Sequence, residues 1–374
     1  MSREFAREER PHLSMSSLVI PSIETLVPYE GGKPVEELAR ELGVTHAIKL
    51  ASNENPLGPS PRALEAARAS LADVHRYPDG AAYSLRDAVA RFHGVARDEV
   101  LQGAGSNELL DLVVRTFATR EHHVVFGDPA FIVYRIAALT YGVPFTAVPL
   151  KDHVHDLPAM AAAVTPKTRV LFVANPNNPT GTHVGRAAVE TLLRTVPPEV
   201  IIVMDEAYFE YADAPDYPSS LALRQLRERL LVMRTFSKAY GLAGLRVGYA
   251  VGPARLIDYM NRVRAPFNTT IPAQAAAIAA LDDQAHVEQS RATNTVERAR
   301  LTRELEGMGL AVAPSQANFV LVDVGRPARP VYDKLLERGV IVRPFGNLPT
   351  SLRVTCGLAH EDDRFLTALN EVLA

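Results

Sequence analysis

The sequence predicts an α/β protein with a large domain built on a mainly parallel sheet flanked by helices, and a smaller α+β domain after it. Short apolar runs alternate with helical patterns, which is typical of a parallel sheet with helices on both faces. The runs lie at 124–126, 145–150, 170–174, 201–204, 230–235 and 247–251. Beyond 264–267 a long charged and alanine-rich helical region, 287–308, leads to three strand-like segments at 318–324, 340–343 and 351–356.

Size and composition favour a two-domain protein that acts on small molecules. The 374 residues are 47% hydrophobic and 22% charged, enough to bury a large core. A net charge of −3 gives no electrostatic footprint for nucleic acid or an anionic membrane. We therefore expect small-molecule partners or a second copy of this chain.

Other features of the sequence favour a cytoplasmic location. The single cysteine, Cys356, excludes an internal disulfide, and we expect it to be a buried structural thiol. No apolar run approaches the roughly 18 residues that a spanning helix needs. The first ten residues mix both charges and are not typical of a secretory signal.

The first 50 residues are expected to form an extension and an arm. Residues 1 to about 17 are typical of a flexible extension, with Met15 as an alternative start, and residues 26–33 form an arm that carries Tyr29. Tyr77 follows in an Arg-Tyr-Pro loop between two helical patterns. The predicted division is 1–50 for extension and arm, 51–264 for the large domain and 265–374 for the small domain.

A glycine-punctuated helix start at 103–108 predicts an anion site. Unpaired N–H groups and the positive end of the helix dipole point at a ligand there, beside Ser106 and Asn107. The segment half-matches a dinucleotide fingerprint, but Glu108 stands where the third glycine would be. We expect a phosphate group at this helix start.

Two further segments deliver polar residues where an apolar run ends. The run 170–174 leads into an asparagine- and proline-rich turn that contains Asn178, and the run 201–204 leads to Asp205 and Tyr208. Ligands of open α/β sheets collect at the carboxyl ends of the strands.

A lysine loop follows the run 230–235. Lys238 stands between that run and a glycine-containing turn, where its amine could form a Schiff base with an aldehyde. Ser237 and Arg246 would bracket a phosphate, because a guanidinium matches phosphate oxygens in a bidentate way. Taken alone, the segment fits a strand, a loop and a surface lysine equally well.

Together these segments resemble the pyridoxal-phosphate-dependent aminotransferases of fold type I, and most of all the histidinol-phosphate aminotransferases. The motifs are spread over nearly the whole chain, and they follow one another in the same order as in that family. They are Leu26-Val27-Pro28-Tyr29-Glu30, Ser52-Asn53-Glu54-Asn55-Pro56, Arg76-Tyr77-Pro78, the asparagine turn, the aspartate strand, the lysine loop and Leu352-Arg353-Val354-Thr355. The resemblance implies an aspartate-aminotransferase-like fold, pyridoxal 5'-phosphate as cofactor and a homodimer with shared active sites.

The resemblance also assigns roles to residues. Lys238 would anchor the cofactor and move a proton, Asp205 would keep the pyridine nitrogen protonated, and Tyr208 with Asn178 would bind the ring hydroxyl. Phe131 would stack on the ring, where relatives often have tyrosine. The phosphate would be held by Ser106, Asn107 (often aspartate in the family), Ser237, Arg246 and Tyr77 of the neighbouring subunit.

Substrate binding is assigned to Tyr29, Asn178, Arg343 and Arg353. Both arginines interrupt apolar strands, where a charge without an anionic partner is unfavourable. The implied reaction passes an amino group between L-histidinol phosphate, with its keto form imidazole acetol phosphate, and glutamate with 2-oxoglutarate. Structural salt bridges would also explain the arginines.

Other functions remain open from the sequence. An aromatic amino-acid aminotransferase or a phosphothreonine-type decarboxylase of the same fold would share most of these residues, and a non-catalytic binding protein could retain the fold. No metal site is expected, because His122, His123, His153 and His155 lack the spacing of metal ligands on a helix.

Overall fold

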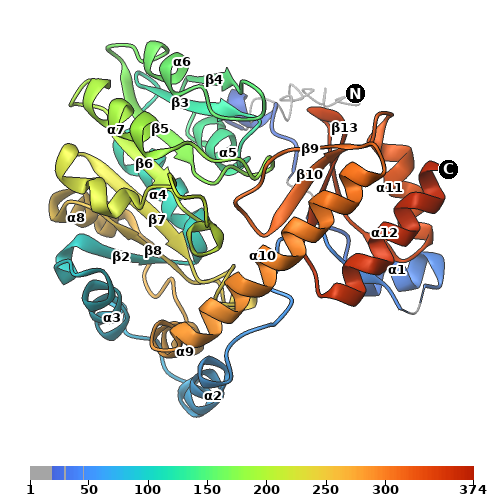
Figure 1. Cartoon of the computed structure of the whole chain (residues 1–374). Helices are drawn as coiled ribbons and strands as arrows, with labels where there is room; N and C mark the ends of the chain where they lie inside the picture. Colours follow the sequence, from blue (N-terminus) through green and yellow to red (C-terminus); the bar gives the residue numbers. More distant parts are fainter. Residues whose placement is uncertain (1–18, 29–30, 45) are drawn as a thin grey trace, which may run out of the picture.

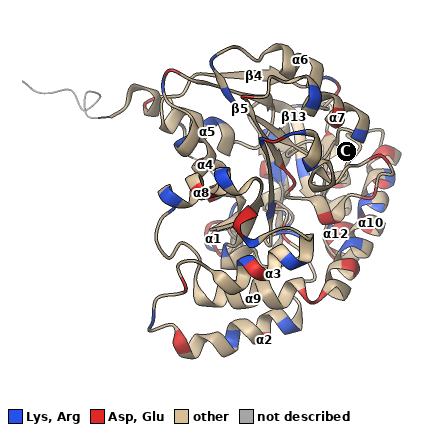
Figure 2. Ribbon diagram, turned by 90° about the vertical axis from the view of Figure 1, so that its left-hand side faces the viewer, with Lys and Arg blue, Asp and Glu red and all other residues tan. Residues whose placement is uncertain are grey.

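Two large sheets with their helices and a small two-stranded sheet make up the described part of the molecule, and a long helix runs beside both large sheets (Figure 1). The computed structural model describes residues 19–28, 31–44 and 46–374. None of the helices in these ranges is long and apolar enough to cross a membrane. Basic and acidic residues are interspersed on surface helices such as α3 (Tyr83–His93) and α10 (Gln284–Gly307), as Figure 2 shows.

The larger sheet has seven strands in the order β2-β8-β7-β6-β5-β3-β4. The strands from β7 to β4 pair in parallel, whereas β8 is antiparallel to both of its neighbours. The prediction of a mainly parallel sheet is confirmed. The bounds are β2 Val100–Gly103, β3 His123–Asp128, β4 Phe145–Pro149, β5 Thr168–Ala174, β6 Ile201–Asp205, β7 Leu230–Thr235 and β8 Gly248–Val251.

Helices cover both faces of this sheet because its central strands are apolar on both sides. Leu171 and Val173 pack into one core with α3, α6 (Leu157–Ala162), α7 (Arg186–Thr195) and α9 (Ile271–Leu281). Val170 and Phe172 point the other way, toward α4 (Gly105–Phe117), α5 (Val133–Thr140) and α8 (Ala254–Val263). Successive residues of a strand face opposite sides, so buried parallel strands read as continuous apolar runs.

The smaller sheet is antiparallel, in the order β12-β13-β10-β9. Its strands are β9 Ala311–Val312, β10 Phe319–Asp323, β12 Arg343–Phe345 and β13 Leu348–Thr355, and its helices include α11 Ala328–Glu337 and α12 Ala359–Leu373. Apolar residues of both helices and the sheet form a separate core. A smaller α+β unit at the C-terminal end is therefore confirmed.

Each unit contains segments that lie far apart in the sequence. Helix α1 (Val35–Leu42) places Leu38 in the core of the smaller unit, and β1 (Ile48–Lys49) pairs in parallel with β11 (Val340–Ile341). Helix α9 instead contributes to the core of the larger unit, next to α2 (Pro61–Ser70). The exact domain boundaries stay a proposal.

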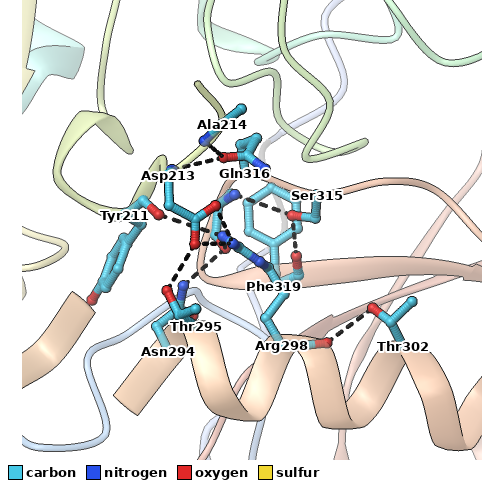
Figure 3. Close-up of polar contacts among 11 residues, drawn as sticks. Tyr211, Asp213, Ala214, Asn294, Thr295, Arg298, Thr302, Ser315, Gln316 and Phe319 are labelled. Atoms are coloured by element: carbon cyan, nitrogen blue, oxygen red, sulfur yellow. Dashed lines mark hydrogen bonds and ion pairs between the residues drawn. The ribbon is translucent and has the colours of Figure 1, made fainter. Parts of the chain in front are cut away.

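A polar cluster connects the two units (Figure 3). Arg298 of α10 donates to both carboxylate oxygens of Asp213, each at 2.8 Å, and Asp213 follows the short helix η5 (Phe209–Tyr211) of the larger unit. Gln316, ahead of β10, accepts from the backbone N–H groups of Asp213 and Ala214 at 2.8 Å. These contacts fix the larger unit against α10 and the smaller sheet.

Candidate active site

A pocket opens where β5, β6 and β7 end, and Arg353 of β13 closes it from the smaller unit. Of the residues predicted from the sequence, the pocket brings together Ser106, Asn107, Phe131, Asn178, Asp205, Tyr208, Ser237, Lys238, Arg246 and Arg353. Ser52, Asn53, Ala174, Pro176, Ala207 and Thr235 complete the lining. Tyr29 lies outside the described residues.

The first turn of α4 and the loop after β7 form a cradle for an anion. Arg246 Nη1 lies 3.4 Å from Ser237 Oγ, and Ser106 and Asn107 line the pocket at the start of the helix. Gly105 has φ +75°, and a Cβ there would come within 2.8 Å of Arg246 Nη2. Only glycine lets the guanidinium reach the helix end, where N–H groups favour a phosphate.

Lys238 Nζ points into the same pocket. It donates to the backbone carbonyls of Ser52, at 3.2 Å, and Asn53, at 3.1 Å. Burial, together with the positive charge of Arg353, lowers the pKa of the amine to about 7. Near neutral pH, a large fraction of the amine is therefore uncharged and able to act as a nucleophile or a base.

Asp205 lines the pocket, and its two carboxylate oxygens have different surroundings. Its Oδ2 accepts a hydrogen bond from the Tyr134 hydroxyl at 2.7 Å. Its Oδ1 is buried and has no hydrogen-bond partner among the described residues. Burial raises the pKa of this carboxyl to about 6, although the hydrogen bond from Tyr134 favours the charged form. Such an oxygen suits a cationic N–H donor of a bound ligand, because buried polar groups are normally paired.

Tyr208 and Asn53 line the pocket together. Asn53 Nδ2 donates to the Tyr208 hydroxyl at 2.9 Å, and both side chains are buried. The Asn53 backbone N–H donates a hydrogen bond to Thr355 Oγ1 of β13, with a nitrogen–oxygen distance of 2.9 Å. The phenol of Tyr208 is thus placed by a residue whose own position depends on the smaller sheet.

A second cavity adjoins the first, and Arg343, the other predicted substrate arginine, lines it. Phe131, Asn178 and Arg353 line both cavities, and Arg343 lines the second. Arg353 donates to Asn178 Oδ1 and to the Ala51 carbonyl, each at 2.6 Å. Arg343 donates to the Gly31 carbonyl at 2.8 Å. The structure thus brings both predicted arginines to adjoining cavities.

Tyr77 lies away from the pocket of its own chain. Its side chain is 81% exposed and stacks on Phe267, with ring centroids 4.7 Å apart. Its predicted contact with a cofactor phosphate therefore requires another subunit.

Sequence reasoning missed residues that support the site. Asn53 belongs to the quoted Ser-Asn-Glu-Asn-Pro motif, so its position could have been inferred. Tyr134 had no comparable signal, because its hydrogen bond to Asp205 joins residues 71 positions apart. No group of three or more His, Cys, Asp or Glu side chains suited to a metal ion occurs among the described residues.

Comparisons with known proteins identify the family. Residues 45–369 match the model of aminotransferase class I and II. The chain is 51% identical to histidinol-phosphate aminotransferase 2 of Pseudomonas aeruginosa, over 96% of this chain and 98% of that protein. It is 48% identical to histidinol-phosphate aminotransferase of Moorella thermoacetica, over 94% and 92% of the two chains.

A solved structure agrees with these relatives. Histidinol-phosphate aminotransferase from Sinorhizobium meliloti, in complex with pyridoxal-5'-phosphate, superposes with a TM-score of 0.88 at 31% identity, over 96% of this chain and 99% of that one. The match of fold, motif order and sequence extends over nearly the full length. The chain therefore belongs to the class I and II aminotransferases, within the group of histidinol-phosphate aminotransferases.

Proposed function

We propose that this chain is a pyridoxal-phosphate-dependent aminotransferase that passes an amino group between L-histidinol phosphate and 2-oxoglutarate, a step of histidine biosynthesis. The names of its relatives suggest this reaction. The observation that carries the proposal is the pair of arginines beside the lysine pocket.

Arg343 and Arg353 stand directly opposite each other on the antiparallel strands β12 and β13. Like charges at such positions are destabilising, because the side chains are only about 5 Å apart at Cβ. The guanidinium carbons lie 5.8 and 5.4 Å from the centroid of the Phe345 ring. A doubly charged phosphate offers enough acceptor oxygens for both guanidinia and would relieve their repulsion.

The residues of the pocket fit pyridoxal phosphate at each end. The cradle of Ser106, Asn107, Ser237 and Arg246 would hold the phosphate. At the other end, Asp205 Oδ1 is the buried oxygen that would accept a hydrogen bond from the pyridine nitrogen. Phe131 would cover a ring face, and Tyr208 with Asn178 would bind the ring hydroxyl.

When bound, pyridoxal phosphate supplies an aldehyde that carries the amino group and a ring that accepts electrons released at the substrate carbon. Lys238 Nζ would anchor that aldehyde, take the proton from the amino-bearing carbon and return a proton in the second half-reaction. Its lowered pKa suits both duties. Arg353 would hold the substrate anion against Asn178, and Tyr29 of the arm would add a hydroxyl donor.

We also propose a homodimer in which Tyr77 serves the partner's phosphate cradle. Leu71 and Val74, close to Tyr77 in the sequence, are 55% and 57% exposed. Exposed apolar side chains of this kind are typical of a surface that another subunit covers. A cytoplasmic location stays a prediction.

The proposed reaction is tested with a panel of amino donors. Histidinol phosphate, phenylalanine, tyrosine and threonine phosphate are compared by kcat/KM with 2-oxoglutarate as acceptor. We expect histidinol phosphate to be preferred, since it alone joins an amino group, an imidazole and a phosphate. A preference for phenylalanine would favour an aromatic aminotransferase, and release of carbon dioxide from threonine phosphate would favour a decarboxylase.

Arg343→Ala tests which group of the substrate the arginine pair binds. We expect kcat/KM for histidinol phosphate to fall about 10- to 100-fold, because a charge-assisted bidentate contact contributes about 1.5–3 kcal/mol. The fall for phenylalanine should be smaller. Arg329→Ala, an exposed arginine that pairs with Asp333 on α11, is the control and should leave both values unchanged. Equal losses for both substrates would contradict the assignment.

A further inference from the structure

Tyr134 holds the carboxylate that faces the cofactor site. It is the second residue of α5, its side chain is 1% exposed, and its hydroxyl donates to Asp205 Oδ2 at 2.7 Å. The other oxygen, Oδ1, is buried without a partner among the described residues. The two oxygens of one carboxylate therefore differ: Tyr134 fixes Oδ2, whereas Oδ1 has no protein partner among the described residues and belongs to a side chain that lines the pocket.

Aromatic neighbours fix the position of the Tyr134 ring. It stacks on Phe172 of β5 with centroids 4.8 Å apart and an interplanar angle of 13°. It also meets Phe131 edge to face, at 6.1 Å, and Phe131 lines the pocket. Because side chains packed in this way have few alternative rotamers, the hydroxyl has a defined direction.

Protonation also favours a donor role for Tyr134. Burial and the charge of Asp205 raise the pKa of the Tyr134 phenol well above its ordinary value, so the hydroxyl stays protonated and donates a hydrogen bond to the carboxylate. Burial, together with the neighbouring Glu206 charge, raises the pKa of Asp205 to about 6. The hydrogen bond from Tyr134 acts in the opposite direction, as does the Ala207 N–H. The charged form of Asp205 thus depends on these few donors.

We propose that Tyr134 is a positioning residue of the reaction: it keeps Asp205 charged and turns Oδ1 toward the pyridine nitrogen of the cofactor. This inference rests on the proposed function. A hydrogen bond to the charged form of a carboxyl stabilises that form alone. Without it, Asp205 competes with the pyridine nitrogen for their shared proton. The ring would then be a weaker electron sink, although every group that touches cofactor or substrate is still present.

The test compares two tyrosines that make the same type of hydrogen bond. Tyr134→Phe removes the hydroxyl next to Asp205 and keeps the stacked ring. Tyr141→Phe is the control, because Tyr141 caps the same helix and donates to Asp111 Oδ2 at 2.9 Å, outside the pocket lining. Each holoenzyme is measured for kcat, for the dissociation constant of pyridoxal phosphate and for thermal unfolding. A pH titration of the visible absorbance of the bound cofactor gives a fourth quantity, the pH at which half of the absorbance change has occurred, which we call the midpoint.

For Tyr134→Phe we expect kcat to fall about 10-fold, the effect of one hydrogen bond to a charged group. The absorbance midpoint should rise by about one pH unit, because a less protonated ring withdraws fewer electrons from the chromophore. The dissociation constant should increase. Tyr141→Phe should leave kcat, the dissociation constant and the midpoint unchanged. If both variants lose the same thermal stability, the lower kcat of Tyr134→Phe cannot be a consequence of weaker folding.

A double-mutant cycle shows whether Tyr134 acts through Asp205. Asp205→Asn alone should lower kcat by about 10²-fold, because it removes the charge that faces the ring. If Tyr134 acts through that charge, adding Tyr134→Phe to Asp205→Asn causes no further change in kcat or midpoint. Independent effects that add in the double variant would overturn the proposal.

A fluorinated tyrosine at position 134 covers the case in which Tyr134→Phe fails to fold. It keeps the shape and the hydroxyl, and its more acidic O–H is a stronger donor, so the midpoint should move downward. An unchanged midpoint would overturn the inference. A wild-type protein with no visible band after incubation with pyridoxal phosphate would instead contradict the proposed function. A wild-type enzyme that turns over while Tyr134→Phe matches Tyr141→Phe would contradict this inference alone.

Discussion

Lys238 is the residue on which the proposed chemistry depends most. Lys238→Ala should abolish transamination while the protein still folds, because one amine serves as anchor and proton carrier. Borohydride reduction of the wild-type holoenzyme, followed by peptide mapping, should find the label on Lys238. Lys167→Ala, in an exposed turn ahead of β5, is the control and should keep full activity. Wild-type turnover of Lys238→Ala, or a label on a different lysine, would disprove the assignment.

Single residues could be predicted from the sequence when they directly follow a strand. Asp205 ends β6 and Lys238 comes three residues after β7, so the apolar runs located both. Tyr134 and Asn53 could not be placed in this way, because each acts through a residue distant in the sequence. Arg343 and Arg353 could be named as anion ligands, but their direct opposition depends on strand register, which the sequence pattern left open.

Elements with a strong pattern were predicted well and those without one were missed. The apolar run 230–235 is β7, and the helix expected at 287–308 is α10 at 284–307. Strands β1 and β9 have two residues each, too few for a periodic signal. Helix α9 is almost entirely apolar, so it has no amphipathic stripe that would separate it from a loop or a strand.

Helix α10 supplies a polar link between the units, and Arg298→Ala tests its importance. The Arg298 side chain is 9% exposed and that of Asp213 is 30% exposed, so the pair is only partly screened by solvent. We expect the free energy of unfolding to fall by about 1–3 kcal/mol, because the variant leaves a partly buried carboxylate without its partner. Denaturant titration measures the change.

The control for this prediction lies on the same helix. Arg291 pairs with Glu288 at 2.9 Å, but both side chains are well exposed, at 43% and 61%. Arg291→Ala should change the free energy of unfolding by less than about 1 kcal/mol, as is usual for surface ion pairs. Equal effects of the two substitutions would show that the link between the units contributes no more than a surface contact.

At the scale of the whole molecule, the site takes residues from both units and, by our proposal, from two chains. Arg353 reaches the pocket from the smaller sheet, whereas Asp205 ends one strand of the larger sheet and Lys238 follows another. Tyr77 remains on the outside of its own chain, against Phe267. Only the family resemblance predicts that the Arg76-Tyr77-Pro78 motif serves a neighbouring subunit, since no local sequence pattern indicates a contact between chains.

Mixing two inactive variants tests this shared site. Lys238→Ala and Tyr77→Ala should regain activity after subunit exchange, because a mixed dimer has one site with both defects and one with neither. Random pairing makes half of the dimers mixed, so recovery should approach about a quarter of wild-type activity in a closed twofold dimer. The control mixture, Lys238→Ala with Asp205→Asn, should gain nothing, since both residues act in their own chain's pocket and every mixed site keeps one defect. A strictly monomeric protein in sedimentation, or mixed dimers without recovery, would show that Tyr77 does not complete a neighbouring site.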